Sequence, residues 1–311
     1  MSEASGPALP SPVAIPPGLA ATLVLVRHGE SEDLAAGRFQ GQRQSPLSEL
    51  GRRQAALAGN RLAEPSSPPH LPVPAGDPVS IVHSPLRRAV ETAAAVRAAF
   101  VAAGRPAPPL RVEPDLLEVG QGEWEGLLQG EVEARYPETI AGWRREPTVV
   151  HAPGGESLAE ADARARAALD RVVAELAAAP RDSAADAPAP GGRTASRPGS
   201  ATTAGSPPWA APPDAAVPSF YGPHAGPWTI LVGHDGIFKV VLLALLGLPL
   251  ERFWSFTQAT AGIAVIDLRN GRAVVRAWNR TEHLAALEAE ADDAERLSEE
   301  LAADRNQRGA L

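Results

Sequence analysis

Cysteine is absent from this chain, and its 311 residues include a single methionine. A protein without cysteine has no disulfide framework, no thiolate zinc site and no thiol nucleophile. The N-terminal segment lacks a basic stretch followed by a continuous apolar one, so we expect no secretory signal. The longest apolar run, residues 240–250, is too short to span a bilayer. These absences predict a cytoplasmic protein with no membrane partner.

The charge of the chain restricts its partners further. The formal net charge is -8, which argues against nucleic acid as a partner. It does not argue against an anionic substrate, because a few arginines in a pocket set the local electrostatic field. The chain is long enough for one large domain with a sizeable core. Composition leaves the oligomeric state open, and a homodimer is one option.

Three segments have compositions that set them apart from a folded core. Residues 1–20 are rich in proline, alanine and serine, and we expect a disordered leader there. Residues 181–228 contain ten prolines without a periodic apolar pattern, which predicts a flexible insertion. Residues 285–311 are acidic, alanine-rich and leucine-spaced, which predicts a solvated helical tail. The remaining span, residues 21–284, is expected to form one domain around the insertion.

Short β-branched apolar runs alternate with helical patterns through this domain. Strands are predicted at residues 22–26, 79–82 and 229–232, with a further pair at 261–267 and 273–278 around an Asn-Gly turn. Helices are predicted at residues 48–63, 88–101, 157–179 and 235–246. The alternation predicts an α/β fold, a three-layer α/β/α sandwich with a mostly parallel central sheet.

Histidine and arginine follow three of the predicted strands directly. Arg27 and His28 follow the first, Arg87 and Arg88 come soon after the second, and His234 follows the third. Loops at the carboxyl ends of parallel strands converge on one crevice, where ligands bind. Arginine presents a fork of donors that matches phosphate oxygens, and a neutral histidine beside it can act as a nucleophile. These residues therefore predict a site for a dianion, with phosphoryl transfer onto His28.

A proton donor is also needed, because the alkoxide that leaves phosphorus must be protonated. Glu118 lies in a glycine-rich loop and is our candidate.

Six motifs, in the same order along the chain, resemble those of the histidine phosphatase superfamily, often called phosphoglycerate-mutase-like. They are LVRHGES at 25–31, GRFQGQRQSPLSELG at 37–51, SPLRRAVETA at 84–93, LLEVGQGEWEG at 116–126, GGES at 154–157 and LVGHDG at 231–236. The chain is most similar to the branch of small-substrate phosphatases. The resemblance implies a phosphoglycerate-mutase-like fold.

The resemblance also implies a two-step, metal-independent hydrolysis. His28 attacks phosphorus and becomes phosphohistidine, while Arg27, Arg88 and His234 hold the phosphate oxygens. Glu118 protonates the leaving oxygen and then activates water. The expected substrate is a small phosphorylated metabolite, and no metal ion or cofactor is required.

Two positions complicate this assignment. Leu34 stands where related proteins often carry an asparagine that helps bind phosphate. Ser31, Asp33 or Gln40 is the candidate for the missing hydrogen bond, and we include Gln40 among the substrate-binding residues. Asp235 follows the second histidine, where another branch of the superfamily places its proton donor, so it competes with Glu118.

Two other functions remain open at this point. A mutase of the phosphoglycerate type would share every catalytic residue and return the phosphoryl group to its product. A non-catalytic phosphate-binding protein is the other alternative, and the leucine at position 34 is its only support.

Overall fold

A single central sheet organises the protein. The structure, a computed structural model, describes residues 9–180, 226–287, 289 and 290. These residues form a six-stranded sheet of order β3-β2-β4-β1-β5-β6. Its strands are β1 (Ala20–Arg27), β2 (Ile81–His83), β3 (Leu110–Val112), β4 (Trp228–Gly233), β5 (Ile263–Arg269) and β6 (Arg272–Arg280). The first four strands pair in parallel, and β5 and β6 are antiparallel.

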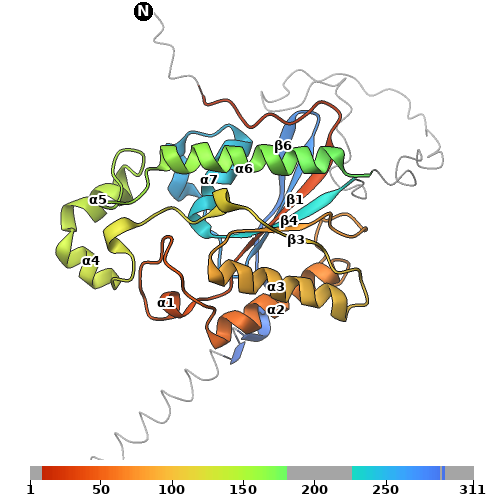
Figure 1. Cartoon of the computed structure of the whole chain (residues 1–311), viewed down its shortest axis with the longest axis horizontal. Coiled ribbons are helices and arrows are strands. Elements are labelled where there is room, and N and C mark those ends of the chain that lie inside the picture. The colour runs from red at the N-terminus through yellow and green to blue at the C-terminus, as the bar shows by residue number, and fades with distance from the viewer. Residues whose placement is uncertain (1–8, 181–225, 288, 291–311) are drawn as a thin grey trace, which may run out of the picture.

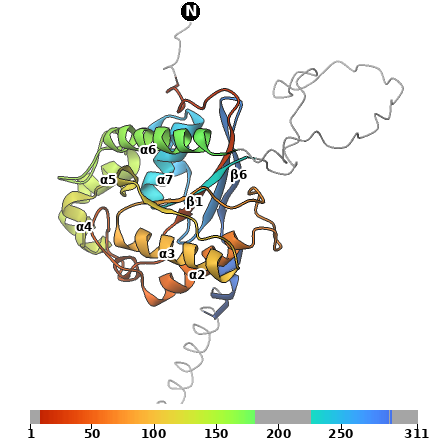
Figure 2. The ribbon, with the colours of Figure 1, turned by 45° about the vertical axis from the view of Figure 1, so that its right-hand side comes forward.

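Two layers of helices cover the sheet (Figure 1). Helices α2 (Glu49–Ala63) and α3 (Arg87–Ala102) lie on one face, and α6 (Leu158–Ala178) and α7 (Asp235–Leu246) lie on the other. Figure 2 shows the same three layers from a second direction. The α/β/α sandwich with a mostly parallel sheet that the sequence predicted is therefore confirmed.

Strand β1 shows why the sequences of the central strands are continuous apolar runs. Its side chains alternate between the two faces of the sheet, as the pleat requires. Leu23 and Leu25 join the core under α6 and α7, whereas Val24 and Val26 join the core under α2 and α3. All four side chains are completely buried, which explains why residues 23–26 are apolar without alternation.

The principal helices begin within one residue of the predicted starts, and two of them, α2 and α6, carry a capping side chain. Ser48 accepts a hydrogen bond from the backbone N–H of Gly51 at the start of α2. Ser157 and Glu160 form a reciprocal capping box at the start of α6. These contacts satisfy backbone donors that the first helical turn leaves without partners.

Several short elements were not anticipated from the sequence. They are strand β3, helices α1 (Glu32–Ala35), α4 (Gln129–Arg135) and α5 (Pro137–Arg145), and the 3₁₀ turns η1 (Pro114–Leu116), η2 (Gly122–Trp124), η3 (Leu250–Ser255) and η4 (Glu282–Leu284). Each is too short to show a clear apolar period. Within the described residues, no helix combines the length and the apolar character needed to cross a membrane.

The expectation of a disordered leader over residues 1–20 is wrong for its described part. Val13, Ile15 and Leu19 are buried against the core that contains α7, and the N–H of Val13 donates to the carbonyl of Ala244 at 3.0 Å. Pro16 and Pro17 lie in a turn closed by the N–H of Leu19 donating to the carbonyl of Pro16 at 3.1 Å, and their fixed φ limits the conformations open to the chain. Composition alone did not reveal this, because the burial depends on a distant helix.

Parts of the other compositional predictions lie outside the described residues. This holds for residues 1–8 of the leader, 181–225 of the predicted insertion, and 288 and 291–311 of the predicted tail. Trp228, the last residue of the predicted insertion, is the first residue of β4. This is the end of the sheet opposite the carboxyl ends of the parallel strands.

Packing of the N-terminal segment can be tested by truncating one side chain. We expect Ile15→Ala to lower the free energy of unfolding by about 2 kcal/mol, because it removes buried methyl groups and leaves a cavity. Leu9→Ala is the matched control, since Leu9 is 71% exposed. Urea denaturation measures both changes. If both substitutions changed the free energy of unfolding by the same negligible amount, the segment would not pack on the core.

Candidate active site

The carboxyl ends of β1, β2 and β4 bring two histidines together. The N–H of His28 donates to the carbonyl of Gly233 at 2.9 Å, and the N–H of Ser84 donates to that of Val232 at 3.0 Å. The ring centroids of His28 and His234 are 5.0 Å apart. A cavity of 290 Å³ opens beside them, and Arg27, His28, Gln40, Arg88 and Glu118 are among its lining residues.

His28 is held in the tautomer that a nucleophile needs. Its Nδ1 donates to the carbonyl of Gly29 at 2.6 Å, and since a carbonyl only accepts, the proton is on Nδ1. The other ring nitrogen, Nε2, therefore carries a lone pair, which receives the Nε–H of Arg88 at 3.2 Å. Burial, followed by the charges of Arg88 and Arg27, lowers the pKa of His28 well below its usual value. The imidazole is consequently neutral at physiological pH.

Glycine is required after His28 because the backbone is crowded there. A Cβ added to Gly29 would lie 2.3 Å from the carbonyl oxygen of Gly51, in the first turn of α2. The loop after β1 therefore packs directly against the start of this helix. That contact fixes the Gly29 carbonyl, which in turn orients the imidazole.

Arg88 brings a buried positive charge to His28. It extends from the first turn of α3 and is 1% exposed. Besides its contact with the imidazole, its guanidinium donates to the carbonyls of Arg43 at 2.9 Å and Gly41 at 2.8 Å. Burial lowers the pKa of Arg88 to about 10, so the side chain keeps its charge at neutral pH.

Arg27 brings the second guanidinium to the cavity. It is the last residue of β1, and its Nη1 donates to the carbonyl of Gln258 at 2.5 Å. Its Nε is buried and has no hydrogen-bond partner among the residues that the structure describes. A donor that lacks a partner inside a cavity is available to a bound anion.

His234 offers a similar group. Its Nε2 is 2.8 Å from the hydroxyl of Ser84, while its Nδ1 is buried without a partner in the described part of the chain. Burial and the charge of Arg88 lower the pKa of His234 well below the usual value, so this ring is also neutral. With the proton on Nδ1, the ring can donate a hydrogen bond to an oxygen bound beside His28.

The carboxylate of Glu118 lies against the N-terminus of α7, and Glu118 lines the same cavity. Its carboxylate accepts from the backbone N–H groups of Val119 at 2.8 Å, Ile237 at 2.9 Å and Gly236 at 3.1 Å. A Cβ on Gly236 would lie 2.5 Å from one carboxylate oxygen, so glycine makes this approach feasible. The arrangement holds a carboxylate in the wall of the cavity that His28 also lines.

Asp235, the competing proton donor, has both carboxylate oxygens engaged. One accepts from the N–H of Gln258 at 2.9 Å, and the other pairs with the ammonium of Lys239 at 2.6 Å. The two carboxylates thus differ in their partners: Asp235 is paired with a charged side chain, whereas Glu118 accepts only from backbone N–H groups.

The structure brings all six expected site residues to one place, His234 next to the cavity and the others in its wall. Leu34 is also in the wall, and Gln40 accepts from the hydroxyl of Ser31 at 2.7 Å. Gln40 therefore keeps its amide N–H groups for another partner.

Other residues of the site were not identified from the sequence as functional. They are Ser84, Gln258, Lys239 and the cavity-lining side chains Arg38, Phe39, Trp143, Phe253 and Trp254. Two of them carried a signal: Ser84 directly follows a central strand, and Lys239 is the only charged residue in an otherwise apolar stretch of α7. The aromatic residues gave none, because packing accounts equally well for them.

Comparisons with known proteins agree with this geometry. A sequence model of the histidine phosphatase superfamily (branch 1) matches residues 23–179 and 221–281. Phosphoserine phosphatase 1 of Hydrogenobacter thermophilus is 30% identical over 274 residues, which cover 88% of this chain and 98% of that protein. The metal-independent phosphoserine phosphatase of Arabidopsis thaliana is 24% identical over 273 residues, covering 85% and 84%. The solved structure of a mycobacterial glucosyl-3-phosphoglycerate phosphatase superimposes with a TM-score of 0.59, at 25% identity, covering 85% and 100%.

Neutral, buried histidines predict a pH-dependent stability. The pKa values of His28 and His234 lie below the value of about 6.5 in an unfolded chain. The unfolded state therefore binds more protons below about pH 6.5, and the free energy of unfolding falls as the pH falls. We expect His28→Asn to reduce this decline by up to about 1.4 kcal/mol per pH unit. Urea denaturation at several pH values measures it, and parallel profiles for both proteins would contradict it.

Proposed function

The chain belongs to the histidine phosphatase superfamily, and we propose that it hydrolyses a small phosphomonoester through a phosphohistidine formed on His28. The observation that carries the proposal is the neutral imidazole of His28, whose Nδ1 is held by a backbone carbonyl and whose Nε2 lone pair meets the buried guanidinium of Arg88. This arrangement combines a free nucleophile with charge that stabilises an anionic transition state.

In the first step, Nε2 of His28 attacks phosphorus and the bond to the ester oxygen breaks. The phosphate oxygens accept from Arg27, Arg88 and His234: the Nε–H of Arg88 points at Nε2 of His28, and Arg27 Nε and His234 Nδ1 have no partner among the described residues. Before the attack, an oxygen of the bound phosphate replaces Nε2 as the acceptor for the Arg88 Nε–H. This exchange frees the Nε2 lone pair. The electrons of the broken bond stay on the leaving oxygen.

Glu118 supplies the proton to that oxygen. Without substrate, three backbone N–H groups hold its carboxylate. In this scheme Glu118 carries the proton when the substrate binds, and transfer of the proton to the leaving oxygen restores the carboxylate. In the second step the carboxylate takes a proton from water, water attacks the phosphohistidine, and phosphate leaves with His28 restored.

The outer part of the cavity suits a small, anionic alcohol. Its walls include the aromatic rings of Phe39, Trp143 and Trp254, which exclude water from one side of the leaving group. Arg38 and Lys239 also line the cavity and are not used by the phosphate in this scheme. Lys239 is paired with Asp235, so we infer that Arg38 is the group that favours substrates with a second negative charge, such as a carboxylate.

Charge stabilisation in this scheme comes from guanidinium groups and does not involve a metal ion. Within the described residues, no group of three or more histidine, aspartate or glutamate side chains is arranged to hold one. The metal-independent relative in Arabidopsis thaliana accords with this scheme.

Phosphatase assays with a chelator test the proposal directly. We expect release of phosphate from p-nitrophenyl phosphate to be unaffected by chelator, and to fall by at least about 10³-fold in His28→Ala, because the nucleophile is lost. Esters with a carboxylate, such as O-phosphoserine, should have a higher kcat/KM than neutral alkyl phosphates. Dependence on a divalent ion, or activity that survives in the variant, would refute the mechanism.

The two candidate proton donors are separated by the choice of leaving group. We expect Glu118→Gln to lower kcat/KM for alkyl phosphates by roughly 10²-fold or more, and for p-nitrophenyl phosphate much less, because nitrophenolate leaves without protonation. Asp235→Asn should affect both esters equally, since it disturbs only the contacts with Lys239 and Gln258. The reverse pattern would identify Asp235 as the donor.

A further inference from the structure

The loop that carries Glu118 has little regular structure of its own. Residues 117–121 lie between the 3₁₀ turns η1 and η2 and take no part in a strand. Their backbone groups therefore lack the ladder of hydrogen bonds that fixes a sheet or a helix. Something else must hold this backbone, because the Glu118 carboxylate acts only from a defined position.

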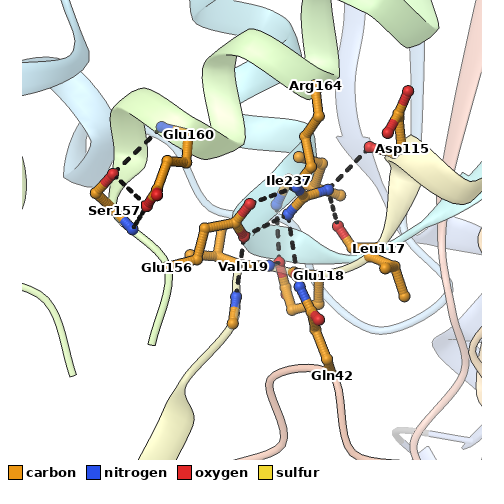
Figure 3. A network of polar contacts seen from close by, with 11 residues as sticks. Gln42, Asp115, Leu117, Glu118, Val119, Glu156, Ser157, Glu160, Arg164 and Ile237 are labelled. Atoms are coloured by element: carbon orange, nitrogen blue, oxygen red, sulfur yellow. Dashed lines mark hydrogen bonds and ion pairs between the residues drawn. The ribbon is translucent and has the colours of Figure 1, made fainter. Parts of the chain in front are cut away.

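Arg164, on helix α6, supplies the missing contacts (Figure 3). Its Nη1 donates to the carbonyls of Asp115 at 2.8 Å and Leu117 at 2.7 Å, and its Nη2 donates to that of Glu118 at 3.1 Å. The remaining Nε–H and Nη2–H groups donate to the two carboxylate oxygens of Glu156, at 2.6 and 2.7 Å. All five donors of the guanidinium thus have an acceptor.

Glu156 holds the other side of the same loop. The carboxylate that pairs with Arg164 also accepts from the N–H of Gly120 at 3.1 Å, and the backbone N–H of Glu156 donates to the Gly120 carbonyl at 2.9 Å. Gln42 adds a further donor to the Glu118 carbonyl, at 3.1 Å. The loop is therefore held on both sides of Glu118 by side chains from other parts of the chain.

Burial makes this arrangement more rigid than a surface ion pair. The side chains of Arg164 and Glu156 are only 15% and 16% exposed. Hydrogen bonds from a charged group to a carbonyl, shielded from water, are stronger than neutral ones. Loss of either partner would leave several buried backbone groups without hydrogen bonds, so the loop would shift.

We propose that Arg164, together with Glu156, is a positioning residue for the proton donor. It touches no substrate and sets where the Glu118 carboxylate lies relative to the leaving oxygen. This inference rests on the proposed function, because it concerns the acid–base step of that reaction. It separates the binding of phosphate, which Arg27 and Arg88 perform, from the protonation of the leaving group.

The test compares leaving groups in variants of Arg164. We expect Arg164→Gln to lower kcat/KM for an alkyl phosphate by roughly 10²-fold and for p-nitrophenyl phosphate by less than about 5-fold, the pattern of a misplaced proton donor. The ratio kcat/KM is used because it reports the step in which the leaving group departs. Inhibition by inorganic phosphate should be unchanged, since the phosphate-binding residues are untouched.

Control variants exclude a general effect on helix α6. Arg166→Gln removes another ion pair of this helix, with Asp162 at 2.7 Å, and should leave both kcat/KM values unchanged. Arg164→Lys keeps the charge without the fork of donors, and we expect it to restore part of the activity on the alkyl ester. Glu156→Gln keeps the guanidinium and provides a second, milder variant if Arg164→Gln does not fold.

The outcomes are distinct. Equal losses on the two esters, or no loss on either, in folded variants would overturn the positioning role. Weaker inhibition by phosphate would overturn it as well, because the defect would then include phosphate binding. A wild-type protein that hydrolyses neither ester would overturn the proposed function, and the positioning role with it.

Discussion

The site depends on keeping an imidazole uncharged among positive charges. His28 is 3% exposed and lies beside Arg88, which is even more deeply buried. In water the imidazole would be partly protonated near neutral pH, and the proton would remove the nucleophile. Burial and the neighbouring guanidinium groups both act against protonation, so the two features that make the site costly to form also keep it reactive.

Buried guanidinium groups impose their own requirements on the fold. Each needs acceptors, and the protein provides them largely from backbone carbonyls, at positions 41 and 43 for Arg88 and at 258 for Arg27. Loops without regular structure expose such carbonyls, since their oxygens are not used by a ladder. The irregular segments around the cavity are therefore the parts of the chain best able to hold these cations.

An arginine also binds backbone carbonyls on the Glu118 side of the cavity. Arg164 holds carbonyls of the Glu118 loop in the way that Arg88 holds carbonyls of the loop after α1. Glu118 in turn caps α7, the helix that begins directly after His234. Glu118, the start of α7 and helix α6 are thus linked through hydrogen bonds, although they are far apart in sequence.

The sequence by itself determined the central strands, the helix starts and the residues that meet at the strand ends. These features follow from local periodicity, capping residues and the rule that parallel strands direct their carboxyl ends to one edge. Only the tertiary structure decided the tautomer of His28, the contacts of Glu118 and Arg164, and the burial of Ile15. The contacts of Arg164 and the burial of Ile15 depend on groups from separate segments approaching within hydrogen-bond or van der Waals distance, and no local pattern encodes that approach. The tautomer of His28 is set by the carbonyl of the next residue, Gly29, but that backbone packs against Gly51 of α2.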